Sequence, residues 1–510
     1  MKYLIQKKTG INLIEVEFNS QDSNIGNNVI KYDYEDKSIS KNIEIRSSMV
    51  TIRFLDKELN RVSLERNVKI GTLFETDIYT TGTNSLILDH NGMAIGFKIS
   101  DGRLGKDGLH KEYFSRVINE DTDIECEMLR FDHYFNGIPT KTEILNILTE
   151  NNNDLSQIVI GFKDETRYLN SLFDGMPLTA SPRMIVGRNV ESLIELFDEC
   201  RSIKYIHDKL FYYCKEVTNL DYCFRNCEKL EAIQSGLFMN NSNVNSISYL
   251  FQYCKLITEI PSKLFDSFTK VDSAFYTFAD CENLKIIPNG LFNNCINLED
   301  VSNCFIYSSI SEIPYDLFYN CINIRYVDYC FYGCELLTSI PSGLFDKNIN
   351  ITSFKACFCY SGVESIPESI FYNNLKARDF SWCFSRCPIT EIPPSLFAKN
   401  INATDFRICF GVCENLTKIP QGLFDKNINV TNFRSLFWDC TSLVTTPFNL
   451  FDNNINTTDF AGCFDGCLAV TSALPDVWNK EKFPNVSNGS RYALGCTKAA
   501  NYAEIPSNFK

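Results

Sequence analysis

The sequence predicts an α/β repeat solenoid over residues 166–480, with a short strand and a short helix in each unit, preceded by a separate, mainly β domain over residues 1–165. Two columns of residues predict this fold. The motif I-P-x-x-L-F recurs at steps of 26 or 27 residues, and a phenylalanine recurs at the same step between the motifs. Units this small cannot bury their own apolar residues, so they must stack and share one core.

The motif column holds prolines at Pro261, Pro288, Pro314, Pro341, Pro367, Pro393, Pro420 and Pro447. Two earlier units keep the frame without proline, at Ile206 and Ile233, and a degenerate last unit lies at residues 474–478. The second column holds Phe197, Phe224, Phe251, Phe278, Phe305, Phe331, Phe358, Phe384, Phe410, Phe437 and Phe464. We expect each ring to face its counterpart in the next unit, where burial contributes roughly 1.5–3 kcal/mol per ring.

Spacing within a unit predicts its local structure. The segment VTNFRSLFWDC, residues 430–440, has apolar residues at i, i+3, i+4 and i+7, namely Phe433, Leu436, Phe437 and Cys440. This is the spacing of one face of a helix, and it predicts about two helical turns. Residues 415–419 have the short length and the closing proline, Pro420, that are typical of a brief strand.

An asparagine recurs five residues after the phenylalanine of L-F, at Asn243, Asn297, Asn323, Asn350, Asn402, Asn429 and Asn456. A stacked asparagine can bond the turn backbone of its own unit and of the neighbouring one, so we interpret this column as a structural ladder. Several positions also spell a glycosylation acceptor, such as Asn429-Val-Thr431, and a sugar site is therefore the alternative.

The domain over residues 1–165 has the alternating pattern of half-buried strands, as in residues 49–54. Residues 85–97 predict a hairpin around Asn91-Gly92, because this pair readily takes the positive φ of a tight turn. One helix is predicted at residues 141–149. We expect this domain to serve attachment or assembly, given its size and position.

The sequence predicts a capping segment at each end of the array. Phe173 and Phe197 already hold the repeat frame within residues 166–200, where the strand motif is weak, so this stretch is interpreted as the N-terminal cap. Residues 481–510 break the period and gain serine, glycine and asparagine. A terminal unit must present one face to water, and we therefore interpret these residues as the C-terminal cap.

The chain has 22 cysteines, and most of them follow the repeat. The pattern C-F-x-x-C lies at Cys223/Cys227, Cys330/Cys334, Cys383/Cys387, Cys409/Cys413 and Cys463/Cys467. Leu250, Thr277 and Leu436 replace the first cysteine elsewhere, which an apolar column tolerates and a metal-ligand set does not. Stacked helices would hold matching Cα atoms about 8–10 Å apart, beyond the roughly 7 Å limit of a disulfide. We predict reduced, buried thiols and no metal site.

The composition of the chain argues against nucleic acid and membranes as partners. The chain has 49 Lys and Arg against 63 Asp and Glu, a net charge of -14, which would repel nucleic acid and anionic membrane surfaces. No apolar run approaches the roughly 20 residues of a membrane helix. The N-terminal MKYLIQKKTGINLIEVEF alternates polar and apolar residues, unlike a secretory signal, so we expect the chain to start in the cytoplasm.

The sequence predicts no enzyme activity and no cofactor. It has no P-loop, no G-x-S-x-G and no H-E-x-x-H motif, and its four histidines are scattered. Positions outside the core columns are free to take part in recognition, because the core does not depend on them. Candidate ligand-binding residues form an aromatic stripe two residues before the column phenylalanines, at Tyr222, Tyr249, Tyr276, Tyr329 and Trp382, with Trp438 as a further surface position. These rings could stack on sugars or anchor a protein, or they could pack sideways on one another.

The repeat resembles that of the BspA-like leucine-rich-repeat surface proteins. Residues 406–413, F-R-I-C-F-G-V-C, and residues 416–424, L-T-K-I-P-Q-G-L-F, carry the resemblance, and residues 495–506 are similar to the endings of that family. It covers about two thirds of the chain and implies a leucine-rich-repeat-like solenoid. It also implies bacterial surface adhesion, and similar arrays occur in bacteriophage structural proteins.

Domain order and the lack of a secretory signal favour a bacteriophage virion protein of the tail or head fibre type, made in the host cytoplasm. We expect residues 1–165 to dock to other virion proteins and the solenoid to contact a host surface glycan or protein. Homo-oligomer formation stays open. The alternatives are a bacterial cell-surface adhesin exported by another route and an intracellular protein–protein interaction scaffold.

Overall fold

The computed structural model describes residues 132–510 with their side chains and, within residues 1–131, the backbone of ten strands. The chain divides into two compact units, Met1–Phe131 and Asp132–Lys510. The second unit begins earlier than residue 166, where the sequence pattern placed the boundary. Its first coils already pair with the array, as the parallel bridge between Asp154 and Ala180 shows, although they lack the repeat motif.

The strands of the first unit are β1 (Lys2–Gln6), β2 (Leu13–Glu17), β3 (Asn27–Tyr34), β4 (Lys37–Glu44), β5 (Met49–Asp56), β6 (Arg61–Lys69), β7 (Leu73–Thr80), β8 (Ser85–Leu88), β9 (His110–Val117) and β10 (Ile124–Arg130). One sheet has the order β6-β5-β10-β8, and β1-β2, β3-β4 and β7-β9 form pairs. β5 spans the strand predicted at residues 49–54. The predicted hairpin begins with β8, and its turn and second strand lie outside the described residues.

The second unit opens with a small parallel sheet of β11 (His133–Phe135), β12 (Val159–Phe162) and β13 (Met184–Val186). Helix α1 (Lys141–Glu150) confirms the helix predicted at residues 141–149. It begins at a capping box, in which the Thr140 hydroxyl accepts from the Glu143 backbone N–H and the Glu143 carboxylate accepts from the Thr140 N–H. Its apolar side, which includes Ile144 and Leu148, is buried in the core.

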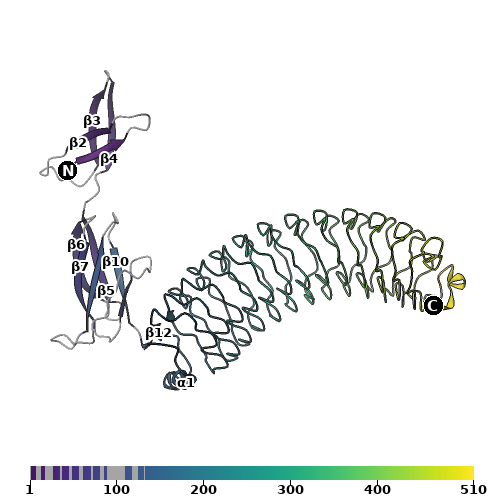
Figure 1. Cartoon of the computed structure of the whole chain (residues 1–510), viewed down its shortest axis with the longest axis horizontal. Helices are drawn as coiled ribbons and strands as arrows, with labels where there is room; N and C mark the ends of the chain where they lie inside the picture. The colour runs from purple at the N-terminus through teal and green to yellow at the C-terminus, as the bar shows by residue number, and fades with distance from the viewer. Residues whose placement is uncertain are drawn as a thin grey trace. The chain divides into compact units, whose positions relative to one another are not determined.

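The units of the array stack side by side along a curved row (Figure 1). The residue five positions before each column phenylalanine forms a one-residue parallel bridge to the next unit, in a continuous series from Tyr168 to Asn488. A second, interrupted set of bridges precedes the prolines, as between Lys418 and Thr445. The strand predicted at residues 415–419 is therefore reduced to a single bridging residue.

The prediction of a short helix in each unit is wrong. No segment is helical between residues 166 and 480, all of which the structure describes. The backbone N–H of Phe437 donates to Cys463 of the next unit at 2.9 Å, whereas that of Trp438 donates to Ser435 within the unit at 3.1 Å. A helix would send every N–H to the fourth preceding carbonyl. Here the N–H groups alternate between the next unit and the third preceding residue.

Left-handed residues explain this winding. Ser435 and Asp439 have φ of 53° and 54°, and the equivalent positions of most other units are also left-handed. They turn the chain once every four residues. Such a coil of successive turns places inward-facing residues at spacings of three and four, as a helix does, so the apolar pattern alone predicted the wrong backbone.

The shared core is confirmed. Every column phenylalanine is fully buried, and neighbouring rings stack in parallel, as Phe197 and Phe224 do with centroids 5.4 Å apart and planes 2° apart. The phenylalanines of L-F form a second buried column, in which Phe371 and Phe397 lie 5.9 Å apart. Both columns belong to one continuous apolar cluster from α1 to Phe509.

The predicted burial of the cysteines is also confirmed, since all 21 described cysteines are buried. In most units the second cysteine of C-F-x-x-C donates its S–H to the backbone carbonyl of the column phenylalanine one unit earlier, as Cys413 does to Phe384 at 3.2 Å. Ser308 holds the same position and donates to Phe278 at 2.7 Å. A hydrogen-bond donor, which serine can also supply, is what this position requires.

Two asparagine ladders support the turns. In the predicted column, the side-chain N–H of Asn429 donates to the carbonyl of Ile401 in the preceding unit at 2.9 Å. These residues bond the neighbouring unit and confirm the ladder. A second, fully buried column escaped prediction: Asn241, Asn348, Asn374, Asn400, Asn427 and Asn454. Asn400, for example, donates to Phe371 and to Asn374, at 3.1 Å each.

Residues 481–510 close the C-terminal end of the array, and they contain two 3-10 turns, η1 (Tyr502–Glu504) and η2 (Ser507–Phe509). The Ala493 N–H donates to the Phe509 carbonyl at 3.1 Å, which satisfies one of the last coil's donors. Within the described part of the chain, the structure has no helix with the length and apolar character needed to cross a membrane.

Candidate binding surface

Three residues of the predicted aromatic stripe form a continuous stack. The rings of Tyr222 and Tyr249 are 4.3 Å apart, and those of Tyr249 and Tyr276 are 5.0 Å apart, with planes within 10° of parallel. All three residues have left-handed φ, between 55° and 60°. Stacking follows from the repeat, because equivalent turn positions in successive units hold their side chains in the same orientation.

The faces of these rings are largely occupied by protein. The Arg225 guanidinium lies 4.7 Å from the centre of the Tyr222 ring, and Phe275 contacts Tyr249 and Tyr276 edge-on. Burial, followed by the neighbouring Tyr222, raises the pKa of Tyr249 to about 12. The sideways packing considered from the sequence is therefore present. The Tyr249 hydroxyl also hydrogen-bonds Tyr222, so the ring edges and the remaining hydrogen-bonding capacity of the hydroxyls are the parts left for a ligand.

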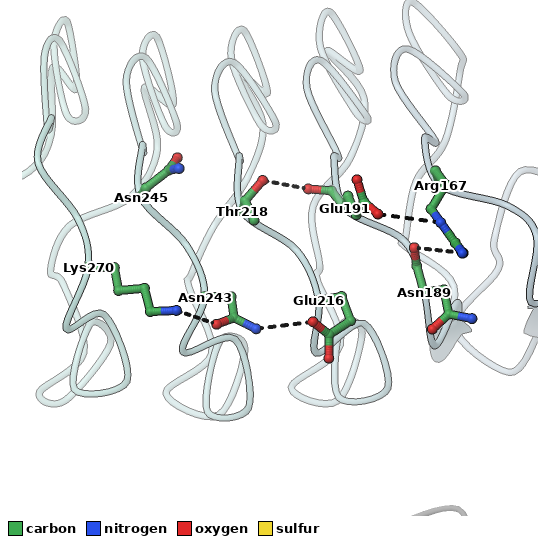
Figure 2. Close-up of a pocket in the computed structure, with 8 residues that line it drawn as sticks. All are labelled: Arg167, Asn189, Glu191, Glu216, Thr218, Asn243, Asn245 and Lys270. Atoms are coloured by element: carbon green, nitrogen blue, oxygen red, sulfur yellow. Dashed lines mark hydrogen bonds and ion pairs between the residues drawn. The ribbon is translucent and has the colours of Figure 1, made fainter.

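A groove of about 570 Å³ runs across neighbouring units of the array (Figure 2). Its lining residues are Arg167, Asn189, Glu191, Glu216, Thr218, Asn243, Asn245 and Lys270. Thr218 and Asn245 stand four residues before Tyr222 and Tyr249. Lys270 likewise stands six residues before Tyr276, so groove and stack share three units.

Two rows of side chains form the groove (Figure 2). In one row the Lys270 ammonium donates to the Asn243 side-chain oxygen at 2.7 Å, and the Asn243 amide donates to Glu216 at 3.3 Å. In the other row the Thr218 hydroxyl donates to the Glu191 carbonyl at 3.0 Å. These bonds hold the lining groups in place one repeat apart.

Every residue that lines the groove has a polar side chain, with two cations, two carboxylates, three amides and one hydroxyl among them. Such a surface can exchange hydrogen bonds with a ligand rich in hydroxyl or amide groups, and its balanced charge selects neither an anion nor a cation. Within residues 132–510, no group of three or more His, Cys, Asp or Glu side chains is placed to hold a metal ion.

A comparison with protein families identifies the repeats. The model of the BspA type leucine-rich repeat region, in six copies, matches residues 191–329, 258–404 and 326–467, which together span more than half of the chain. The chain belongs to the BspA-type leucine-rich-repeat family. As a BspA-type repeat protein it is of the surface or protein-interaction class.

Other comparisons add little to this assignment. A search of curated proteins gave no match. Among solved structures, the crystal structure of the TLR13-ssRNA13 complex includes a chain that is 12% identical, with a TM-score of 0.33. The similarity covers 62% of this chain and 49% of that chain, so the BspA-type chain spans about half of its length.

The other predicted binding residues of the BspA-type array lie apart from the stack. Asn303 occupies the stripe position after Tyr276 and ends the row of rings. Tyr329 is half-buried beside Tyr332, with the Lys355 ammonium 5.6 Å from its ring centre. Trp382 and Trp438 are half-buried in later units. Tyr329, Trp382 and Trp438 therefore remain separate predictions.

The groove was not predicted as a binding site, although Asn243 was placed in the asparagine ladder, because no two of its residues form a motif along the chain. Each row joins residues about 27 positions apart, such as Glu216 and Asn243. The signal that could have found them is the alignment of units in register. At Glu216, Asn243 and Lys270 that alignment places side chains of different charge on neighbouring coils, where they can bond one another.

Proposed function

We propose that this BspA-type chain is a non-enzymatic structural and adhesion protein of a bacteriophage particle, of the tail or head fibre type. The predicted docking domain, residues 1–165, is reduced to residues 1–131, because residues 132–165 belong to the array unit. Residues 1–131 dock to other virion proteins, and the solenoid contacts a glycan or protein of the host surface. The division into a unit without repeats and a repeat unit supports this arrangement. No cofactor or nucleic acid takes part.

The observation that carries the proposal is the polar groove that shares its units with the tyrosine stack. The groove supplies fixed hydrogen-bond donors and acceptors, among them the amide of Asn243, which bonds Lys270 and Glu216. The stack supplies aromatic edges and hydroxyls from Tyr222 and Tyr249. Aromatic anchors and fixed polar groups presented by the same elements are typical of recognition surfaces.

Binding of the fluorescently labelled full chain to host cells tests the recognition role. We expect the double variant Glu216→Ala, Asn245→Ala to bind at least tenfold more weakly. The matched control, Glu312→Ala with Asn289→Ala, changes the same residue types at a smaller, distant groove and should bind normally. Equal binding by both variants would remove the groove from the proposed function.

Peptide mass spectrometry of purified phage particles tests the virion assignment. The chain should be present at a fixed ratio to the other structural proteins, and antibody to the array should reduce adsorption. Its absence from particles, together with protease sensitivity on intact bacteria, would instead support the bacterial cell-surface adhesin, which family membership also favours. A single soluble partner recovered from lysate would support the intracellular scaffold.

A further inference from the structure

A row of exposed aliphatic side chains runs along seven consecutive units, four residues after the phenylalanine of L-F. The row, here called the aliphatic stripe, is Ile296, Ile322, Ile349, Leu375, Ile401, Ile428 and Ile455. Each residue is between 51% and 55% exposed. The units before it have Lys215, Ser242 and Thr269 at this position, so the stripe belongs to one part of the array.

The fold does not require these aliphatic residues. Each occupies an exposed turn, where polar residues and glycine are favoured. The ladder amides bond only the backbone carbonyl of stripe residues, as Asn429 does at Ile401, and a polar residue would supply the same carbonyl. Single exposed aliphatic residues are ordinary on protein surfaces, but a contiguous row marks an interaction surface.

The two rows that flank the stripe contain no carboxylate. One row lies two residues before each stripe position and the other lies one residue after it, and all fourteen positions are asparagine or lysine. The lysines are Lys347, Lys376, Lys399 and Lys426. On a chain with a net charge of -14, these two rows carry four cations and no carboxylate; the carboxylates of Asp346, Asp425 and Asp452 stand one residue outside them.

The flanking rows are also self-complementary. All ten asparagines donate their side-chain N–H to a carbonyl of the preceding unit, as Asn402 does to Leu375 at 2.9 Å and Asn373 does to Asp346 at 3.2 Å. Most of their side-chain oxygens are left as acceptors. Within the chain, the Lys376 ammonium already donates to the Asn350 side-chain oxygen at 2.7 Å. Lysines of one copy can make the same bond to asparagines of another.

We propose that the aliphatic stripe is the face on which a second copy of this chain packs. Two copies have the same repeat step, so their stripes stay in register along their length, which an unrelated partner would not ensure. Seven half-exposed side chains on each copy would bury on the order of 1,000 Å² in total, the lower end for a stable interface, before the flanking rows are counted. The result is a homo-oligomer through the repeat array.

Sedimentation velocity of the full chain tests the proposal. The native chain should self-associate, and the triple variant Ile349→Ser, Leu375→Ser, Ile401→Ser should sediment as a monomer with an unchanged thermal midpoint. The matched control is Ile286→Ser, Leu336→Ser, Val444→Ser, which removes three exposed aliphatic side chains from other rows and should associate like the native chain.

Two results would overturn the proposal: a native chain that is monomeric at roughly 100 μM, or a stripe variant that associates as tightly as the native chain. The second result would place the contact elsewhere, for example in residues 1–131. A positive test uses Leu375→Cys and the control Ile286→Cys under mild oxidation. Only the stripe cysteine should form a disulfide between copies, and failure of that cross-link in an associated sample would also contradict the proposal.

Discussion

The Cys413 thiol donates a 3.2 Å hydrogen bond to the backbone carbonyl of Phe384, one unit earlier in the array. The bond joins the two features that define the repeat, the phenylalanine column and the cysteine column. Because the thiol is fully buried, no water can replace it as the donor. It therefore explains why small donors hold this position in most units.

The stability of Cys413 variants should follow the ability of the new side chain to donate a hydrogen bond. Cys413→Ser keeps a donor, as Ser308 does naturally, whereas Cys413→Val fills the space but donates nothing. We expect Cys413→Val to be less stable than Cys413→Ser by about 1 kcal/mol, measured by urea unfolding. The reverse order would mean that packing, and not the bond to Phe384, decides stability at this position.

Substitution in the buried asparagine column should lower the free energy of unfolding more than substitution in the exposed column. Asn400→Ala leaves the carbonyls of Phe371 and Asn374 without a side-chain donor inside the protein and should cost about 2 kcal/mol. Asn402→Ala removes one bond at the surface, to Leu375, where water can substitute, and should cost about 0.5 kcal/mol or less. Equal losses in chemical unfolding would contradict the assignment of Asn400 as the main support of its turn.

Truncation of a column ring should unfold its neighbourhood first. Phe410 stacks on Phe384 and Phe437, with centroids 5.9 and 5.8 Å away. Phe410→Ala should cost about 3–5 kcal/mol. In a repeat array the units interact mainly with their neighbours, so hydrogen exchange should accelerate mostly in the units on either side. Uniform acceleration along residues 132–510 would show that the array unfolds as one block.

The buried thiols make stability depend on alkaline pH. Burial raises the pKa of Cys440 from an ordinary 9.0 to about 12, and it raises the pKa of the other described cysteines as well. A raised pKa in the folded state means that stability is complete below the ordinary value and falls as pH rises from 9 toward 12. The thermal midpoint should therefore drop across this range. Rapid reaction of native protein with a thiol reagent at about pH 8 would contradict this burial.

The tyrosine stack allows binding to be separated from stability. Tyr249→Phe keeps the ring contacts with Tyr222 and Tyr276 but removes the hydroxyl, and Tyr249→Ala removes both. We expect Tyr249→Phe to unfold at the native midpoint while binding host cells several-fold more weakly, and Tyr249→Ala to lose about 1 kcal/mol as well. Normal cell binding by Tyr249→Ala would confine the stack to a structural role.

The sequence predicted those parts of the fold that depend on one residue type at a fixed step. Phe410 and Cys413 could be placed in the core because their equivalents recur in nearly every unit. Helix α1 could be placed because its signals are local: Thr140 and Glu143 form the cap within four residues of each other. Both predictions rest on information contained in a short stretch of chain.

The predictions that failed all concern features whose partner lies in a neighbouring unit. The N–H of Phe437 bonds Cys463, so the turn coil is stabilised by a residue 26 positions away that a search for helical spacing does not consider. Asn400 and Asn402 differ by two positions, yet one is fully buried and the other lies at the surface. The groove was missed for the same reason, since its rows exist only once the coils are stacked.

Alternate N–H groups of each coil are satisfied by the coil that follows, and this has a consequence for how such proteins change length. Whole coils can be gained or lost without leaving a donor stranded, because any coil presents the same carbonyls to its predecessor. A truncation within the array is different, because it would leave a row of unpaired backbone N–H groups at the exposed end. Another chain could then bind there. Related proteins should therefore differ by insertion or deletion of whole repeat units. The C-terminal segment around Phe509, which closes the array, should be kept.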